Sequence, residues 1–113
     1  MGSAPGTAFQ YQIENSKDDT GNAVTTIKCS GRIVSDTAGQ LKELVKPLIA
    51  KGGGHILIDL ADVTYLDSSG LGTLVGLKAS ALNAGYCRLE LVNATPRILD
   101  LLRITKLTQM FAS

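Results

Sequence analysis

A short segment in the second half of the chain combines two hydroxyls, one carboxylate and two glycines at the start of an apolar, helix-like stretch. It reads Asp67, Ser68, Ser69, Gly70, Leu71 and Gly72. Asp67 or Ser68 suits the N-cap of that helix, where a side-chain oxygen accepts a hydrogen bond from a first-turn N–H group. The other first-turn N–H groups give the helix start a partial positive charge that favours a phosphate. Two hydroxyls at such a start predict a phosphorylation site, although the spacing alone favours an ordinary helix cap.

The two glycines of this segment also have two interpretations. Without side chains, Gly70 and Gly72 would let the backbone or the active site of another protein approach the helix start. The same residues would equally permit tight packing between the helix and the sheet of the chain itself. The sequence leaves this choice open.

The spacing around the serines does not fit a hydrolase. A nucleophile elbow needs a glycine two residues before the serine, but Leu66 and Asp67 take that place for Ser68 and Ser69, respectively. In an α/β-hydrolase the histidine follows the serine, whereas the single histidine of this chain, His55, precedes both. We therefore predict that the chain is not a hydrolase.

Cofactor- and metal-binding patterns fail in a similar way. Gly70, Gly72 and Gly76 are spaced one residue too widely for a dinucleotide fingerprint, and the triple glycine at 52–54 leads into a strand and not into a helix as a P-loop does. The carboxylates of this region that could suggest a magnesium cluster are Asp59, Asp62 and Asp67. They lack the acidic pair and the lysine of a receiver domain, so solvated carboxylates are the favoured interpretation. We expect no enzymatic activity, no metal and no cofactor.

The overall composition narrows the class of protein. The 113 residues fit one domain, and 11 basic against 10 acidic residues leave a net charge of +1, which argues against nucleic-acid binding. Cys29 and Cys87 are too few for a disulfide framework and suit buried free thiols. The sequence shows neither a signal peptide nor an apolar run near the ~20 residues of a membrane span. We therefore expect a cytoplasmic protein without membrane insertion.

The elements that position the serine segment follow from the apolar periodicity. Strands are predicted at residues 9–13, 23–30, 56–60 and 88–92, and helices after Ser35 and Asp36, over 68–84, and from Pro96. This order, β-β-α-β-α-β-α, is typical of a single-domain α/β fold with a mixed sheet and βαβ crossover helices. Gly31 is expected to end the second strand, and residues 56–60 to be a central strand buried on both faces.

The periodicity also predicts the core and the ends of the chain. We expect burial of Leu57, Leu60, Leu71, Leu74, Leu89, Leu91 and Leu101, and inward orientation of Val75 and Leu82. Pro47 is expected to kink the first helix or shorten its last turn. Residues 1–8 are expected to form a flexible tail, and residues 106–111 a further short element.

The stretch from Val63 to Gly72 resembles the signature of the STAS domain, a family that takes its name from sulfate transporters and anti-sigma factor antagonists. The resemblance covers most of the chain and is greatest to the free-standing bacterial antagonists, because the chain is short and has no membrane segment. It implies a partner switch. The unphosphorylated antagonist binds an anti-sigma factor that is also a GHKL-type serine kinase, phosphorylation by ATP breaks the complex, and a serine phosphatase resets the switch.

By this resemblance the phosphorylated residue is Ser68, with Ser69 as the second choice. The implied partner-binding residues are Asp67, Ser68, Ser69, Gly70, Leu71 and Gly72. Arg32 and Val34 depart from the family, because many antagonists have acidic residues at these two positions. The chain also stops where relatives usually continue into another strand and helix, so residues 9–113 are expected to form a STAS-like domain that is either minimal or a fragment.

Two functions are therefore open. The first is an anti-sigma factor antagonist switched by phosphorylation of Ser68, and the intact pair of serines favours it. The second is a non-switching scaffold or transporter-accessory subunit, which Arg32 and Val34 favour slightly. The identity of the partner, the pathway and any self-association cannot be read from the sequence.

Overall fold

The computed structural model describes residues 9–51, 54–85 and 87–111, so the predicted tail at 1–8 lies outside the described residues. The elements are β1 (Gln10–Lys17), β2 (Ala23–Ile33), α1 (Ala38–Ala50), β3 (His55–Leu66), α2 (Ser68–Ala84), β4 (Arg88–Val92), α3 (Pro96–Ile104) and α4 (Thr108–Phe111). The predicted order of strands and helices is confirmed, and α4 is the short element expected near the C-terminus.

The four strands form one mixed sheet in the order β1-β2-β3-β4. β1 and β2 are an antiparallel hairpin, whereas β2, β3 and β4 run parallel to one another. β3 lies between β2 and β4, which confirms the central position predicted for residues 56–60. The α/β fold class is therefore confirmed. None of the helices described is both long and apolar enough to cross a membrane.

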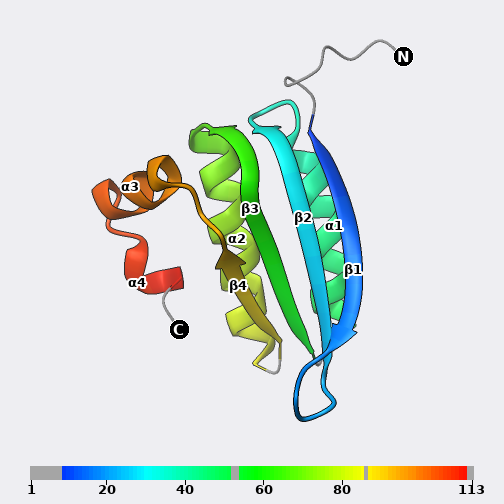
Figure 1. The fold of residues 1–113 in the computed structure, drawn as a ribbon. Coiled ribbons are helices and arrows are strands. Elements are labelled where there is room, and N and C mark those ends of the chain that lie inside the picture. The colour runs from blue at the N-terminus through cyan, green and yellow to red at the C-terminus, as the bar shows by residue number, and fades with distance from the viewer. Residues whose placement is uncertain (1–8, 52–53, 86, 112–113) are drawn as a thin grey trace.

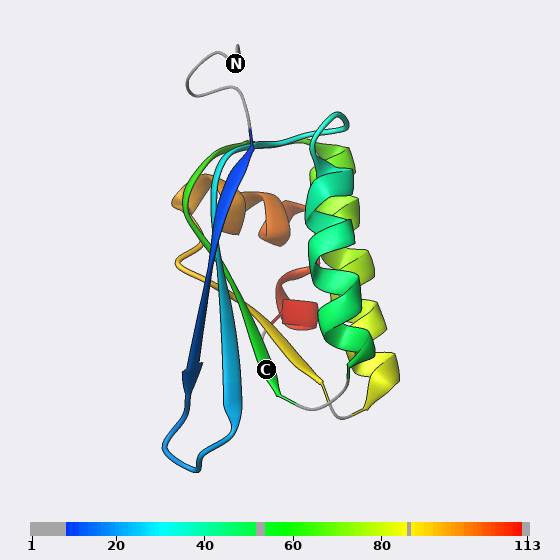
Figure 2. The same cartoon turned by 90° about the vertical axis from the view of Figure 1, so that its right-hand side faces the viewer.

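The helices cover only one face of this sheet. Figure 2 shows α1 and α2 side by side against the same face, and Figure 1 shows α3 and α4 beyond β4. Along β3, Ile56, Ile58 and Leu60 face the helices and are buried, whereas the alternate side chains of His55, Leu57 and Asp59 are only partly buried. The prediction of burial on both faces is wrong, because both crossover helices pack on the same side.

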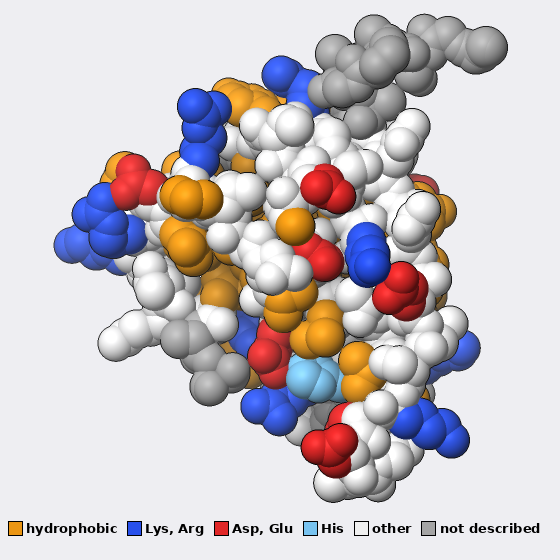
Figure 3. Space-filling model, in the orientation of Figure 1, with side chains coloured by type: hydrophobic (Ala, Val, Ile, Leu, Met, Phe, Trp, Pro, Cys, Tyr) orange, Lys and Arg blue, Asp and Glu red, His pale blue; other side chains and the backbone are white. Residues whose placement is uncertain are grey.

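The uncovered face carries the polar half of each strand. Figure 3 looks onto this face and shows basic, acidic and apolar side chains interspersed. Lys28 on β2 forms a 3.1 Å ion pair with Glu14 on β1, which is an exposed cross-strand pair. Such interspersed charges keep an open sheet face hydrated.

The core fills the space between the sheet and the two long helices. Its largest fully buried side chains include Ile27, Ile33, Leu41, Ile58, Leu60, Leu74, Leu77 and Leu89. Of the predicted core leucines, Leu60, Leu71, Leu74 and Leu89 are buried, whereas Leu57, Leu91 and Leu101 are partly buried. Leu82 is 61% exposed, so its predicted inward orientation is wrong. The buried stripe of α2 runs instead through Leu74, Leu77 and Ala81.

Several predicted boundaries also need correction, among them that of β1, which continues to Lys17 and not only to residue 13. β2 does not end at Gly31 but continues to Ile33, because Gly31 adopts a φ of +90° at a shift in the β2–β3 register. β3 continues to Leu66, beyond the end at residue 60 that the sequence predicts. α1 begins after Thr37, not after Ser35 and Asp36, and it continues through Pro47 to Ala50.

The two thiols lie in the core, and their burial has a consequence at alkaline pH. Burial and, to a smaller extent, the charge of Asp59 raise the pKa of the Cys29 thiol from 9.0 to about 12. Burial also raises the pKa of Cys87. The folded protein therefore holds these protons more tightly than the unfolded chain does. This stabilisation is complete below pH 9 and is lost as the pH rises toward 12.

We expect the free energy of unfolding to fall above pH 9 by about 1.4 kcal/mol per pH unit from Cys29 alone. Urea unfolding between pH 7 and pH 11 measures this slope. A Cys29→Ala variant, although less stable at pH 7 because of the cavity, should show a flatter profile. An unchanged slope in the variant would contradict the assignment to Cys29.

Candidate functional site

The serine segment lies where β3 passes into α2, next to the end of β2. Leu66, the last residue of β3, pairs with Ile33, the last residue of β2. Asp67 follows with an extended backbone, and its N–H donates to the Ile33 carbonyl at 3.3 Å. α2 therefore starts directly above the carboxyl ends of two parallel strands, which is where open α/β sheets bind their ligands.

Asp67 is the N-cap of α2, one of the two residues predicted for that role. Its Oδ1 accepts a hydrogen bond from the Gly70 N–H at 2.9 Å. Its other oxygen, Oδ2, accepts from the Ser35 N–H at 3.3 Å. The carboxylate therefore caps the helix and also ties the β2–α1 loop to the start of α2. The second contact was not predicted, because Ser35 and Asp67 are far apart in the sequence.

Replacement of Asp67 tests this double role. Asp67→Ala removes both acceptors and should lower the free energy of unfolding by about 1–2 kcal/mol. Asp67→Asn keeps an oxygen for the cap but loses one of the two acceptors, so its loss should be smaller. Urea denaturation compares the two variants with the wild type, and an alanine variant of wild-type stability would contradict the capping role.

Ser68 and Ser69 are the first two residues of α2, and both are exposed. Because Asp67 caps the helix, neither hydroxyl is needed for that purpose. No hydrogen bond between residues that the structure describes uses the Oγ of either serine. Both hydroxyls are therefore accessible, and each lies at the positive end of a 17-residue helix.

The two glycines of the segment differ in their surroundings. Gly70 is buried, and a Cβ built there would lie 2.1 Å from the Ile33 carbonyl oxygen and 2.7 Å from Leu66 Cδ1. Gly72 is exposed, with nothing within 4 Å of such a Cβ. Gly70 thus permits close packing of α2 on the chain's own sheet, whereas Gly72 leaves the outer helix surface open. Leu71 between them is buried in the core.

The β2–α1 loop supplies further residues around this helix start. Thr37 Oγ1 donates to the Arg32 carbonyl at 2.6 Å and accepts from the Val34 N–H at 3.0 Å, which closes the loop. The Arg32 guanidinium lies 4.6 Å from the centroid of the Tyr65 ring, a cation–π distance. The sequence singled out Arg32 only because it replaces an acidic residue of the family. Its contact with Tyr65 was not predicted, because that contact depends on how β2 and β3 pair.

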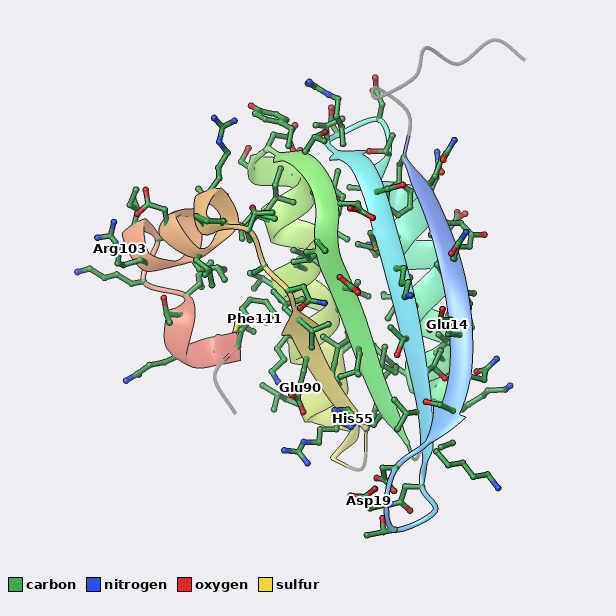
Figure 4. The ribbon with its side chains drawn as sticks, in the orientation of Figure 1. Glu14, Asp19, His55, Glu90, Arg103 and Phe111 are labelled. Carbon is green, nitrogen blue, oxygen red and sulfur yellow. The ribbon has the colours of Figure 1, made fainter. Side chains whose placement is uncertain are left out.

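The remaining candidate residues make contacts away from the serine segment. In the described ranges, no group of three or more His, Cys, Asp or Glu side chains could hold a metal ion. Figure 4 shows His55 beside Glu90 on the sheet, and His55 Nε2 lies 2.7 Å from Glu90 Oε2. Arg88 Nε contacts the same oxygen at 3.1 Å. Asp59 Oδ1 accepts a hydrogen bond from the Ala61 N–H.

The amino-acid sequence matches a known protein family and named relatives. The family model described as "Mlab, STAS domain" matches residues 16–112. An anti-sigma-B factor antagonist of Staphylococcus epidermidis is 33% identical over 84 residues, which are 74% of this chain and 77% of that protein.

Two solved structures share the fold. An anti-sigma factor antagonist from Mycobacterium paratuberculosis matches with a TM-score of 0.74 and 24% identity, over 97% of this chain and 87% of that chain. The Bacillus cell fate determinant SpoIIAA in its phosphorylated form matches with a TM-score of 0.68 and 18% identity, over 89% and 87% of the two chains. The match over residues 16–112, which contain the whole Asp67–Gly72 segment, shows that this chain belongs to the STAS domain family.

Proposed function

We propose that this chain is an anti-sigma factor antagonist that works by partner switching. The unphosphorylated chain binds an anti-sigma factor that is also a serine kinase, and phosphorylation of Ser68 releases it, so that sigma-factor-dependent transcription is regulated. The 33% identical relative with the name anti-sigma-B factor antagonist supports this function. A GHKL-type kinase and a serine phosphatase would be the enzymes of this switch, and the chain itself would be their substrate.

The observation that carries the proposal is the separation of roles between Asp67 and Ser68. Asp67 caps α2, so the helix does not need the Ser68 hydroxyl as a cap. That hydroxyl is exposed and forms no hydrogen bond with the residues that the structure describes. A kinase can therefore modify Ser68 without removing a contact that holds the fold together. Ser69, which is exposed in the same turn, is the second choice.

A phosphate on Ser68 would change the surface and leave the fold in place. A phosphoserine carries roughly −1.5 to −2 charges near neutral pH. The N–H groups of the first helical turn stabilise such a charge, although the neighbouring Asp67 carboxylate partly opposes it. A partner packed over the helix start would have to desolvate the dianion, which is unfavourable without a positive group opposite it. The switch therefore acts at the interface.

A second candidate is a scaffold or transporter-accessory STAS protein that does not switch. Arg32 and Val34 favour it, because neither offers the carboxylate that many antagonists present beside the signature. The Arg32 side chain instead stacks on Tyr65 within the chain. In this case Asp67, Ser68 and Ser69 would form only a helix cap and a contact surface.

A reconstituted reaction separates the two functions. The full chain is mixed with the serine-kinase-type anti-sigma factor of the same organism, with and without ATP and Mg²⁺, and analysed by size exclusion and mass spectrometry. We expect a complex without ATP, and one phosphate on Ser68 with loss of the complex after ATP. Ser68→Ala should bind and stay bound. Stable binding with phosphate on neither Ser68 nor Ser69 would favour the scaffold.

A further inference from the structure

The outer surface of the two long helices contains a groove that extends beyond the start of α2. It runs between α1 and α2 and has a volume of about 490 Å³. Its lining includes Lys42, Lys46, Ser69, Gly72, Gly76 and Ser80. Figure 2 shows α1 and α2 side by side, with their N-terminal ends at the same end of the molecule. The groove therefore begins at Ser69, next to the proposed switch residue, and extends away from it along the helices.

One wall of this groove is basic and has no acidic counterpart. Lys42 and Lys46 are exposed on α1, and neither forms an ion pair among the residues that the structure describes. Among the described residues that line the groove, none carries a carboxylate. The N-terminal ends of both helices lie at its upper end and add positive potential there. The electrostatic potential of the groove therefore favours an acidic occupant.

The wall formed by α2 is shallow, because the residues that line it have small side chains or none. Gly72, Gly76 and Ser80 follow one another at intervals of four residues along α2. A Cβ built on Gly72 or Gly76 would meet nothing within 4 Å, so the packing of this chain does not require either glycine. An interior helical glycine is destabilising by roughly 0.5–1 kcal/mol relative to alanine. Both glycines therefore leave room above α2, beside the two lysines, for the backbone of another chain.

The spacing of the lysines defines what would fit. Lys42 and Lys46 are one helical turn apart, about 6 Å along the axis of α1. Carboxylates at positions i and i+4 of a partner helix have the same spacing and face the same side. From Ser69 to Ser80 the groove follows α2 for roughly 16 Å, which is three helical turns.

We propose that the α1–α2 groove binds an acidic helix of the anti-sigma factor, with two carboxylates one turn apart opposite Lys42 and Lys46. This proposal rests on the proposed function for the identity of the partner, and on the groove itself for the chemistry of the bound segment. It extends the contact surface from the helix start along the outer side of both helices. It also adds contacts with the partner along α1 and α2 that lie farther from Ser68 than the helix start does.

The first experiment tests the groove without the anti-sigma factor. The ¹⁵N-labelled full chain is titrated with an alanine-based helical peptide that carries two glutamates at i and i+4, and with the same peptide carrying glutamines. We expect amide shifts at Gly72, Gly76 and Lys46 with the glutamate peptide only, and we expect them to weaken as salt is added. Shifts elsewhere, or equal shifts with both peptides, would overturn the proposal.

The second experiment uses the anti-sigma factor. The double variant Lys42→Glu/Lys46→Glu should bind it at least tenfold more weakly, whereas Lys17→Glu/Arg97→Glu, with the same change in net charge, should bind within about twofold of wild type. Circular dichroism verifies that both variants fold. Equal binding by both double variants would overturn the groove as the docking site and leave the proposed function intact. Peptide shifts in the groove without any anti-sigma binding would refute the proposed function and leave the groove as a docking site for an acidic helix of another partner.

Discussion

Phosphorylation of Ser68 is expected to weaken binding to the anti-sigma factor by about 100- to 1000-fold while the fold remains unchanged. A buried, unpaired charge costs a few kcal/mol, and about 2.7–4.1 kcal/mol corresponds to this range of affinity. Ser68 is exposed at the first position of α2, and Asp67 keeps the cap, so no native hydrogen bond needs to break. The loss should therefore appear in the dissociation constant and not in the melting temperature.

Aspartate at this position offers a simpler form of the same measurement. Ser68→Asp carries about one charge in place of two, so its effect should have the same direction and a smaller size. Ser16→Asp, an exposed position on β1, adds the same charge away from the site and should bind like the wild type. Isothermal titration and thermal unfolding measure binding and stability on the same samples. Wild-type affinity for Ser68→Asp would contradict the switch and favour the scaffold.

Sequence reasoning succeeded at both ends of α2 and at the start of α3, where the decisive signals are local. The α2 helix begins and ends where the sequence predicts, because Asp67 caps one end and Gly85, with a φ of +82°, closes the other. Thr95 and Pro96 define the start of α3 in the same way. A side-chain cap needs only residues within one turn of each other, so adjacent residue types can indicate it. Thr37 before α1 makes no side-chain cap, and the start of that helix was predicted at the wrong residues.

Other features that were mispredicted or missed depend on contacts between distant segments. The carboxylate of Asp67 reaches Ser35 because β2 and β3 end side by side, which no local pattern reveals. The open sheet face follows from both crossover helices packing on the same side. Lys42 and Lys46 are exposed on α1, and they form a basic wall only because α2 lies next to α1 with small residues opposite them.

The sharpest test of the site geometry compares alanine at its two glycines. Gly70→Ala places a Cβ 2.1 Å from the Ile33 carbonyl oxygen, closer than real contacts allow. That oxygen also accepts the Asp67 N–H, so neither the strand end nor the helix start can move away without loss of a hydrogen bond. Overpacking of this kind should lower the free energy of unfolding by about 2–3 kcal/mol. For a chain of this size the melting temperature should fall by roughly 10–20 °C.

Gly72→Ala adds the same methyl group two residues away but should have the opposite effect on stability. Its Cβ meets nothing within 4 Å, so the helix should gain roughly 0.5–1 kcal/mol from the lower backbone entropy of the unfolded chain. Thermal unfolding of the two variants should therefore shift in opposite directions from the wild type. Similar losses in both would contradict the placement of Gly70 against Ile33. A stabilised Gly72→Ala that nevertheless binds the anti-sigma factor less tightly would show that the chain keeps this glycine for its partner, because the fold itself is more stable without it.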